Sequence, residues 1–430
     1  MPERETIKAD LTIIGNGLAG LGAALYALNR GLSVVQFGSG YPLSLVSGCF
    51  DLFSVCPSAG KKEWDNPWEG LKVLRNDHPE HPLARIEEVE IRQAFEEFSV
   101  GLGEAGLSYV QDPERNREII TPLGTIKKTF GLPRSMWLGA EALERKAMGR
   151  IIEIEGLEGF KAPLIVDRLK PHWKGLSAGR IQFPGFESRP RALAEHLASS
   201  LILSANREKL AQRLRREING AEVMGLPAVL GLFKSSAVME DLREQIGIPL
   251  FEIPTLPPSV PGLRLQETLE RKAAEKGTYH LFRHRVGKAE PGKDGGFKVP
   301  ILHDGETIRT VSSRAVILAG GRFLGGGLQA DRKTVREPLF GLPVSQPDSR
   351  SGWHRSDFFN RQGHEINRAG LEVDDRFRPF NRQKEPAYET LFAVGSILAH
   401  QDWKREKCGS GLALATALGA VKAFLGIKNK

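Results

Sequence analysis

The run Gly15-Asn16-Gly17-Leu18-Ala19-Gly20 constrains the fold more than any other part of the sequence. It follows a β-rich segment at residues 9–14 and precedes a helical pattern at residues 18–30, so a strand, a glycine turn and a helix are predicted. In such a turn the first glycine permits a tight bend, the second lets a phosphate approach the backbone, and the third lets the helix pack closely. Free N–H groups at the start of the helix then hold the anion. The sequence therefore predicts a nucleotide or flavin site formed by Gly15, Gly17, Leu18, Ala19 and Gly20.

The second strand, expected at residues 33–37, ends without a carboxylate. A dinucleotide fingerprint places an Asp or Glu there to bind the adenosine ribose, but residues 36–39 read Gln-Phe-Gly-Ser. Their composition favours a cofactor held mainly by its phosphate, such as FMN, and leaves FAD as the alternative. Residues 36–39 also contain no basic residue, so they do not favour NADP as the cofactor.

Two later segments resemble the re-entry strand and the last strand of flavoproteins with two dinucleotide-binding domains. Residues 314–322 (RAVILAGGR) and 391–396 (LFAVGS) each lead from an apolar strand into glycine, and Ser396 replaces the usual acid. Residues 408–420 (CGSGLALATALGA) resemble the small-residue helix whose N-terminus faces the flavin ring. The resemblance implies an α/β fold, a Rossmann-like FAD/NAD(P)-binding domain with an inserted α+β domain. It adds Gly320, Gly321, Gly395, Ser396, Gly409 and Gly411 to the expected cofactor contacts.

Changes in composition suggest the domain boundaries. Residues 57–82 are rich in proline, tryptophan and charge, which is typical of a departure from the first folding unit. We expect a discontinuous flavin-binding domain at residues 1–56, 262–330 and 387–430. The insert would span 57–261 as a substrate, cap or partner-contact domain, and residues 331–386 would be an excursion from the flavin domain. The final helix, near 411–425, is apolar or small on nearly every face and should be buried.

Composition limits the other possibilities. Three cysteines without a C-x-x-C pair support neither a disulfide framework nor a cysteine-ligated metal cluster, and they fit a cytoplasmic protein. The N-terminus lacks the features of a secretory signal, and the uncharged run 11–29 holds four glycines, so we expect no signal peptide and no transmembrane helix. The net charge of +8 would suit a flavoprotein acting on RNA. However, the basic cluster at 207–216 has apolar residues at helical spacing and no aromatics, which favours an ordinary solvated helix face and no nucleic-acid partner.

Four loop segments resemble one family closely. They are residues 47–54 (SGCFDLFS), 121–125 (TPLGT), 254–266 (PTLPPSVPGLRLQ) and 336–342 (REPLFGL). They are similar to segments of the B subunit of anaerobic glycerol-3-phosphate dehydrogenase, and the resemblance covers about residues 8–426.

This resemblance implies a flavoprotein subunit of an enzyme that oxidises glycerol 3-phosphate to dihydroxyacetone phosphate and passes electrons to quinone, then to fumarate or nitrate. The implied cofactor is FMN. The implied partners are an FAD-containing A subunit and a membrane-attached iron–sulfur C subunit, which would make this chain a peripheral membrane protein through its partners. An electron-relay or assembly subunit without its own substrate site is the alternative.

The remaining candidate residues follow from position and chemistry. Ser47 and Gly48 follow the second strand, where related flavoproteins contact the flavin. Arg264 and Arg336 lie beside turns and could bind a substrate phosphate. His354, Arg355 and His400 are candidates for acid–base catalysis, because imidazole titrates near neutrality. No metal site is expected: His280 and His284 lie four residues apart in a predicted strand without a neighbouring acid.

Overall fold

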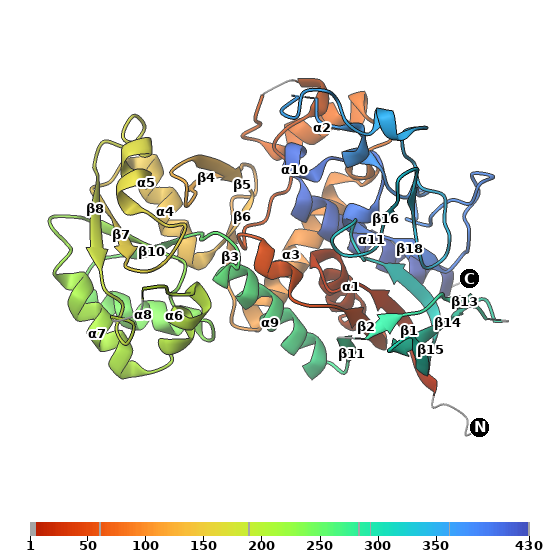
Figure 1. Cartoon of the computed structure of the whole chain (residues 1–430), viewed down its shortest axis with the longest axis horizontal. Coiled ribbons are helices and arrows are strands. Elements are labelled where there is room, and N and C mark those ends of the chain that lie inside the picture. Colours follow the sequence, from red (N-terminus) through yellow and green to blue (C-terminus); the bar gives the residue numbers. More distant parts are fainter. Residues whose placement is uncertain are drawn as a thin grey trace. The chain divides into compact units, whose positions relative to one another are not determined.

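The structure is a computed structural model that describes residues 6–59, 62–187, 190–282, 284–292, 294–360 and 362–428 (Figure 1). The chain divides into two compact units. Unit 1 comprises Met1–Pro42, Asp51–Gly101 and Leu269–Lys430, and unit 2 comprises Leu43–Phe50 and Leu102–Thr268. The sequence-based boundaries at 57, 261, 331 and 387 stay a prediction. The two units divide the chain elsewhere, and residues 57–101, expected in the insert, belong to unit 1.

A mixed sheet is the centre of unit 1. Within the described residues its strands run in the order β11-β2-β1-β15-β14-β12, with β13 beside β14 and β18 beside β15. The strands β11, β2, β1 and β15 are parallel. One edge of β15 pairs antiparallel with β14 over its first half and parallel with β18 over its last residues. The strands are β1 Thr6–Ile14, β2 Val34–Gly38, β11 Tyr279–Phe282, β12 Arg285–Val286, β13 Glu290–Pro291, β14 Phe297–His303, β15 Glu306–Leu318 and β18 Leu391–Ala393, with the separate pair β16 Gln329–Ala330 and β17 Val335–Arg336.

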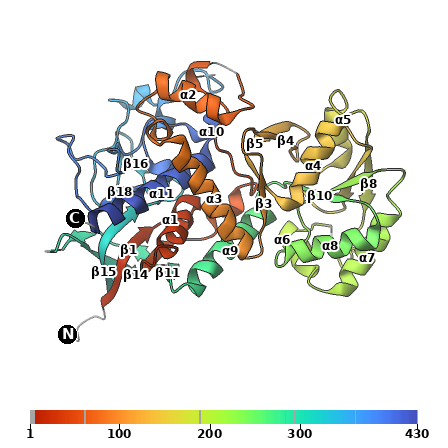
Figure 2. The same ribbon diagram turned by 180° about the vertical axis from the view of Figure 1, so that it is seen from behind.

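Helix α1 (Leu18–Leu28) lies between α3 (Glu88–Glu104) and α11 (Gly409–Lys428), as the view from behind shows (Figure 2). Gly22 of α1 lets Leu414 of α11 approach, since a Cβ on Gly22 would stand 3.2 Å from that side chain. On the α3 side the hydroxyl of Tyr26 donates to the carbonyl of Ala94 at 2.7 Å. The helices of unit 1 are α1 Leu18–Leu28, α2 Pro67–Asp77, α10 Trp403–Glu406 and α11 Gly409–Lys428, while α3 Glu88–Glu104 and α9 Val260–Glu275 carry the chain across the division between the units.

The final helix is buried, as its composition predicts. Among the described residues α11 is the one helix that is long and apolar enough to cross a membrane, and two thirds of its apolar window lies inside the protein (67% buried). Such burial is typical of a core helix.

Unit 2 is built on a second, all-parallel sheet. Its strands run in the order β10-β9-β7-β8, and helices connect them. Residues 117–129 form a separate hairpin, β4 with β5, whose turn is the 121–125 segment with Gly124 at φ 71°. The elements are β3 Tyr109–Gln111, β4 Arg117–Ile120, β5 Ile126–Thr129, β6 Gly131–Pro133, α4 Arg134–Arg145, β7 Gly149–Ile154, α5 Ala162–Leu169, β8 Leu176–Ile181, α6 Ala194–Ser200, α7 Ser204–Arg215, β9 Val223–Pro227, α8 Ser235–Ile246 and β10 Leu250–Ile253.

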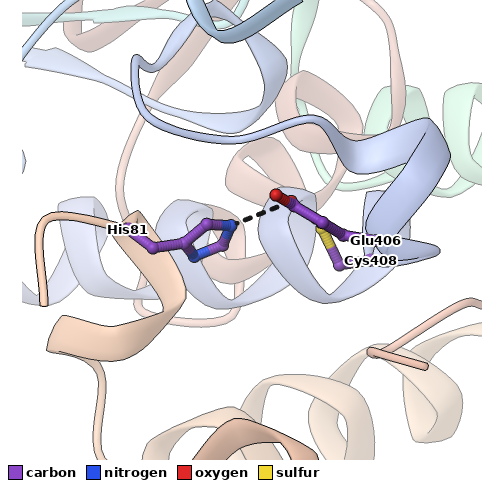
Figure 3. A group of neighbouring side chains, drawn as sticks. All are labelled: His81, Glu406 and Cys408. Atoms are coloured by element: carbon purple, nitrogen blue, oxygen red, sulfur yellow. Dashed lines mark hydrogen bonds and ion pairs between the residues drawn. The ribbon is translucent and has the colours of Figure 1, made fainter. Parts of the chain in front are cut away.

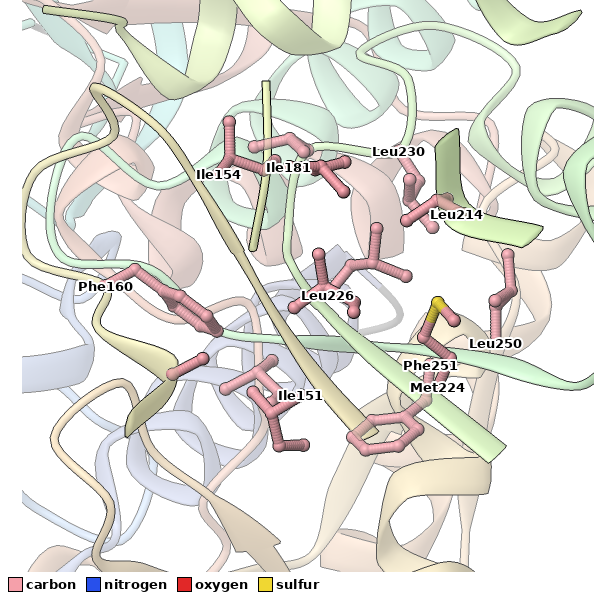
Figure 4. Close-up of a cluster of buried hydrophobic side chains, with 14 of the residues drawn as sticks. Ile151, Ile154, Phe160, Ile181, Leu214, Met224, Leu226, Leu230, Leu250 and Phe251 are labelled. Carbon is pink, nitrogen blue, oxygen red and sulfur yellow. The ribbon is translucent and has the colours of Figure 1, made fainter. Parts of the chain in front are cut away.

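The hydrophobic core of unit 2 explains its strand pattern. Ile151, Ile154, Leu226 and Phe251 from three strands meet side chains of the covering helices in one cluster (Figure 4). Strands that are buried on both faces read as continuous apolar runs, which is the case for parallel sheets covered by helices. The inserted region therefore mixes helices and strands as expected, with a parallel main sheet and the antiparallel pairs β3–β6 and β4–β5.

The basic side chains of α7 form ion pairs and hydrogen bonds within unit 2. Arg207 forms an ion pair with Asp241, and Arg213 pairs with Glu187 at 2.6 Å. Nε of Arg215 donates to the carbonyl of Gln245 at 2.6 Å. These arginines hold neighbouring elements together on an exposed helix face.

Candidate functional site

The glycine turn after β1 has two glycines that packing requires and one that it does not. Gly15 has φ 129°, and a Cβ there would stand 2.2 Å from the carbonyl oxygen of Ala319. A Cβ on Gly20 would stand 2.0 Å from the carbonyl oxygen of Gly15. A Cβ on Gly17 would meet no atom within 4 Å. The missing side chain at Gly17 therefore leaves open space, which is what a phosphate group needs at the second glycine.

Unused hydrogen-bond donors face this space. The first backbone bond of α1 runs from the N–H of Leu21 to the carbonyl of Gly17 at 2.9 Å. In the part of the chain that the structure describes, the N–H groups of Leu18, Ala19 and Gly20 find no acceptor. Free N–H groups and the positive end of a helix dipole favour an anion. The residues fit the phosphate of a nucleotide or flavin.

Three glycine turns converge here in unit 1. Gly15 lies against Ala319 and Gly320 at the end of β15, and a Cβ on Gly395 would stand 2.7 Å from the Cβ of Ala19. A Cβ on Gly321 would stand 3.5 Å from the hydroxyl oxygen of Ser396. All three turns follow parallel strands, and ligands of open α/β sheets bind at the carboxyl ends of such strands. The structure thus brings together the predicted contacts from residues 15–20, 320–321 and 395–396.

The first N–H groups of α11 form hydrogen bonds within the protein. The N–H groups of Ser410 and Gly411 donate to the carbonyl of Asp51 at 3.0 and 2.9 Å. A Cβ on Gly411 would stand 2.4 Å from the carbonyl oxygen of Leu52. The chain itself uses these donors, and the cofactor contacts predicted at Gly409 and Gly411 stay predictions. At Gly411, packing against Leu52 explains the absence of a side chain.

The end of β2 is filled by the protein. Gln36 is fully buried and its Nε2 donates to the carbonyl of Gly15 at 2.9 Å. A Cβ on Gly38 would stand 2.4 Å from Cγ of Asn16. The Asn16 side chain donates to the carbonyl of Gly40 at 3.1 Å and accepts from the N–H of Ser39 at 3.3 Å. Asn16 therefore occupies the space beside residue 38, and its small-residue neighbours Gly38 and Gly40 were the sequence signal for this packing.

Ser47, Gly48 and Arg264 belong to unit 2. The hydroxyl of Ser47 accepts from the N–H of Cys49 at 3.3 Å, and the carbonyl of Gly48 accepts from the hydroxyl of Tyr109 at 2.6 Å. Arg264 is 3% exposed and forms two hydrogen bonds with the carboxylate of Glu252 at 2.6 and 2.9 Å. Its Nε donates to the carbonyl of Gly231 at 2.6 Å. Arg264 is a structural ion-pair residue, and the expectation that it binds a substrate phosphate has no support in its surroundings.

Three other predicted residues are exposed. Arg336 lies on the short strand β17, and His354 packs its ring against that of His364. Arg355 forms an ion pair with Glu365 at 3.0 Å between two side chains about two-fifths exposed. The roles proposed for Arg336, His354 and Arg355 stay predictions.

His400 lines a polar pocket in unit 1. The pocket has a volume of about 380 Å³, and His78, His81, Arg368 and Glu406 contribute to its wall. Nε2 of His400 lies 2.9 Å from a carboxylate oxygen of Glu372. Burial would raise the pKa of Glu372, but hydrogen bonds from Lys384 and His400 outweigh it and hold that pKa below its ordinary value.

A second histidine–carboxylate pair is fully buried beside the pocket (Figure 3). One carboxylate oxygen of Glu406 lies 3.1 Å from Nε2 of His81 and 3.5 Å from the sulfur of Cys408, and it accepts from the N–H of Asp402 at 3.0 Å. Nδ1 of His81 accepts from the N–H of Leu83 at 3.1 Å.

The same contacts assign the hydrogen-bond roles within this cluster. Since Nδ1 of His81 is an acceptor, its Nε2 carries the proton and donates to Glu406. Burial raises the pKa of the Cys408 thiol well above its ordinary value, and the charge of Glu406 raises it further. The three side chains have a spacing that could suit a metal ion, but their hydrogen bonds already satisfy one another and explain why they are buried.

The sequence matches the model of the FAD binding domain family over residues 10–412. The chain belongs to this family. It is 30% identical to the B subunit of the anaerobic glycerol-3-phosphate dehydrogenase of Vibrio vulnificus strain YJ016, over 98% of this chain and 97% of that protein. It is 28% identical to the corresponding B subunit of Vibrio cholerae strain El Tor Inaba N16961, over 97% and 96% of the two chains. It is therefore a member of this family of B subunits as well, which confirms the resemblance found in the sequence.

Solved structures give a more distant likeness. The 3-ketosteroid delta1-dehydrogenase of Sterolibacterium denitrificans is 11% identical, with a TM-score of 0.45 over 98% of this chain and 100% of that one. The family assignment confirms the predicted flavoprotein fold class. It also favours FAD as the cofactor, whereas the sequence alone favoured FMN.

Proposed function

We propose that this FAD-binding-family chain is a flavoprotein subunit of an anaerobic glycerol-3-phosphate dehydrogenase. The reaction is oxidation of glycerol 3-phosphate to dihydroxyacetone phosphate, with electrons passed to quinone and then to fumarate or nitrate. The observation that carries the proposal is the open space at Gly17, which lies beside unused N–H groups where three glycine turns meet. Its relatives carry the name of that enzyme's B subunit.

The proposed cofactor is FAD, which supplies a hydride acceptor and a carrier of electrons when bound. The N–H groups of Leu18, Ala19 and Gly20 would hold its phosphates, and the turns at Gly320 and Gly395 would contact the rest of the cofactor. Residues 36–39 offer no side-chain carboxylate for an adenosine ribose, which was the argument for FMN. The absorbance spectrum of the purified protein, with the mass of the released cofactor, distinguishes FAD, FMN and no flavin.

Glycerol 3-phosphate itself tests the reaction. Flavin bound to the purified chain should bleach when glycerol 3-phosphate is added without oxygen, and glycerol should serve as the control substrate. A chain that keeps its flavin but does not bleach would be an electron-relay subunit, and a folded chain without flavin would be an assembly subunit. Either result would overturn the dehydrogenase role for this subunit.

The proposed partners are an FAD-containing A subunit and a membrane-attached iron–sulfur C subunit, which would place this cytoplasmic chain at the membrane surface. A flavin buried in a protein needs a relay to reach a quinone in the bilayer. Co-expression followed by size-exclusion chromatography should give one heteromeric peak. Separate peaks, together with quinone reduction by the A and C subunits alone, would contradict this assembly.

A further inference from the structure

The polar pocket of unit 1 has an unusual pairing of charges. Three carboxylates in its wall have their own partners: Glu80 lies 3.4 Å from His78, Glu406 lies 3.1 Å from His81, and Glu365 pairs with Arg355. These pairs account for each acidic side chain that lines the pocket among the described residues.

Arg368 is the exception. Arg368 is half-buried and lines the same pocket, and no hydrogen bond or ion pair of its guanidinium is found in the described part of the chain. A guanidinium presents a planar set of donors that matches a phosphate or carboxylate with two parallel hydrogen bonds. An unpaired arginine in the wall of a pocket of about 380 Å³ therefore points to a small anion.

A candidate base stands beside it. The N–H of His400 donates to the carbonyl of Arg368 at 3.0 Å, and the backbone of His400 has φ 63°, in the left-handed region. Left-handed non-glycine residues are uncommon and gather at functional sites. Because the Glu372 carboxylate accepts from Nε2 of His400 at 2.9 Å, Nδ1 is left with the lone pair that can take a proton.

The pocket is tied to the glycine turns. The guanidinium of Arg322, which directly follows Gly321, donates to the carbonyls of Ile366 and Asn367, the two residues before Arg368. His400 in turn follows the Gly395–Ile397 turn by three residues. Both sides of the pocket thus continue from turns that form the cofactor cradle.

We propose that this pocket binds the phosphate group of a small phosphorylated alcohol through Arg368, beside a base, His400, that Glu372 orients. The inference rests on the proposed function for the identity of the alcohol. Oxidation of a secondary alcohol to a ketone removes a hydride from carbon and a proton from the hydroxyl. A flavin bound at the glycine turns would supply the hydride acceptor, and Nδ1 of His400 would take the proton of the hydroxyl.

Binding to the purified flavin-loaded protein tests Arg368. Glycerol 3-phosphate and inorganic phosphate should bind by calorimetry, and Arg368→Gln should weaken both by about 10- to 100-fold, the range for a hydrogen bond to a charged group. Arg368→Lys should recover part of the loss. Arg332→Gln, at an exposed arginine of the same unit, is the matched control and should leave binding unchanged.

The rate of flavin reduction separates the base from the anion site. His400→Asn, which tolerates the left-handed backbone, should bind phosphate within about threefold of the wild type but lower reduction at saturating glycerol 3-phosphate by about 100-fold or more. Glu372→Gln should lower the rate less. Unchanged binding in Arg368→Gln, or malate binding more tightly than phosphate, would overturn the phosphate site. Binding that depends on Arg368 without any flavin reduction would support the anion site and contradict the proposed reaction.

Discussion

In both units the parallel strands end at the edge of the sheet where α/β proteins bind ligands, but the two edges are built differently. In unit 1 the strands β1, β15 and β18 lead into glycine turns, with open space at Gly17. In unit 2 the edge after β9 and β10 is closed by a buried ion pair. The carboxylate of Glu252 accepts from the N–H of Leu230 at 2.8 Å and from Arg264, which also donates to the carbonyl of Gly231.

The difference teaches where the fold can take a ligand. A parallel sheet offers unused backbone donors and acceptors after its strands, and these must be satisfied by the protein or by a ligand. In unit 2 the side chains of Glu252 and Arg264 satisfy the N–H of Leu230 and the carbonyl of Gly231. In unit 1 donors on α1 without acceptors among the described residues lie next to the open space at Gly17, so we place the candidate cofactor site in unit 1.

The largest expected effect comes from a substitution in the glycine turn of unit 1. Gly17→Val should abolish flavin retention while the protein stays folded, because the new side chain enters the phosphate space and meets no protein atom. Flavin absorbance after gel filtration measures it. Gly20→Ala is the comparison variant. It should lower the unfolding temperature of the protein, because its Cβ would overlap the carbonyl of Gly15. Normal flavin content in folded Gly17→Val would contradict the cradle.

Breaking the buried ion pair of unit 2 should lower the stability of the protein. Arg264→Met leaves the buried Glu252 carboxylate unpaired, and breaking one side of a buried ion pair costs about 3–5 kcal/mol. Urea unfolding measures the loss. The double variant Arg264→Met with Glu252→Gln should recover part of it, since the uncompensated charge is removed. A stable Arg264→Met protein that no longer binds glycerol 3-phosphate would instead restore the substrate role that the sequence suggested for Arg264.

The glycine turn of unit 1 could be predicted from the local sequence, but the buried ion pair of unit 2 and the polar pocket could not. The spacing of Gly15, Gly17 and Gly20 is set within one turn, so sequence alone identified it. Glu252 and Arg264 are separated by a loop, and nothing in their spacing shows that they pair. The polar pocket joins residues near 80, 368 and 400, whose proximity depends on the whole of unit 1. Arg368 was missed for that reason, whereas His400 was found by its place after the last strand.

The buried pair of His81 and Glu406 should make unit 1 sensitive to acid. Burial alone would raise the pKa of Glu406, but hydrogen bonds from His81, Asp402 and Cys408 hold it below the ordinary value of 4.5. The stabilisation is therefore fully present above pH 4.5 and is lost as the pH falls through the folded-state pKa.

Glu406→Gln tests this directly. It should lower the free energy of unfolding by about 1–3 kcal/mol at pH 7, because a buried network loses its acceptor charge. The difference between wild type and Glu406→Gln should shrink as the pH is lowered from 5 to 3 in urea titrations. Glu80→Gln, at the half-exposed acid of the same pocket, is the control and should change stability by less than about 0.5 kcal/mol. A difference that stays constant with pH would contradict the ionised state of Glu406.

The smallest effect concerns the end of β2 in unit 1, where the Asn16 side chain fills the space beside Gly38. Asn16→Ala removes two long hydrogen bonds to the 39–40 turn and should cost about 1 kcal/mol. Gly38→Ala should cost more, because its Cβ would overlap the Asn16 side chain, and the double variant should be more stable than the sum of the single losses predicts. Thermal unfolding of the four proteins gives this coupling. Additive losses would show that the Asn16 side chain does not occupy the space beside residue 38.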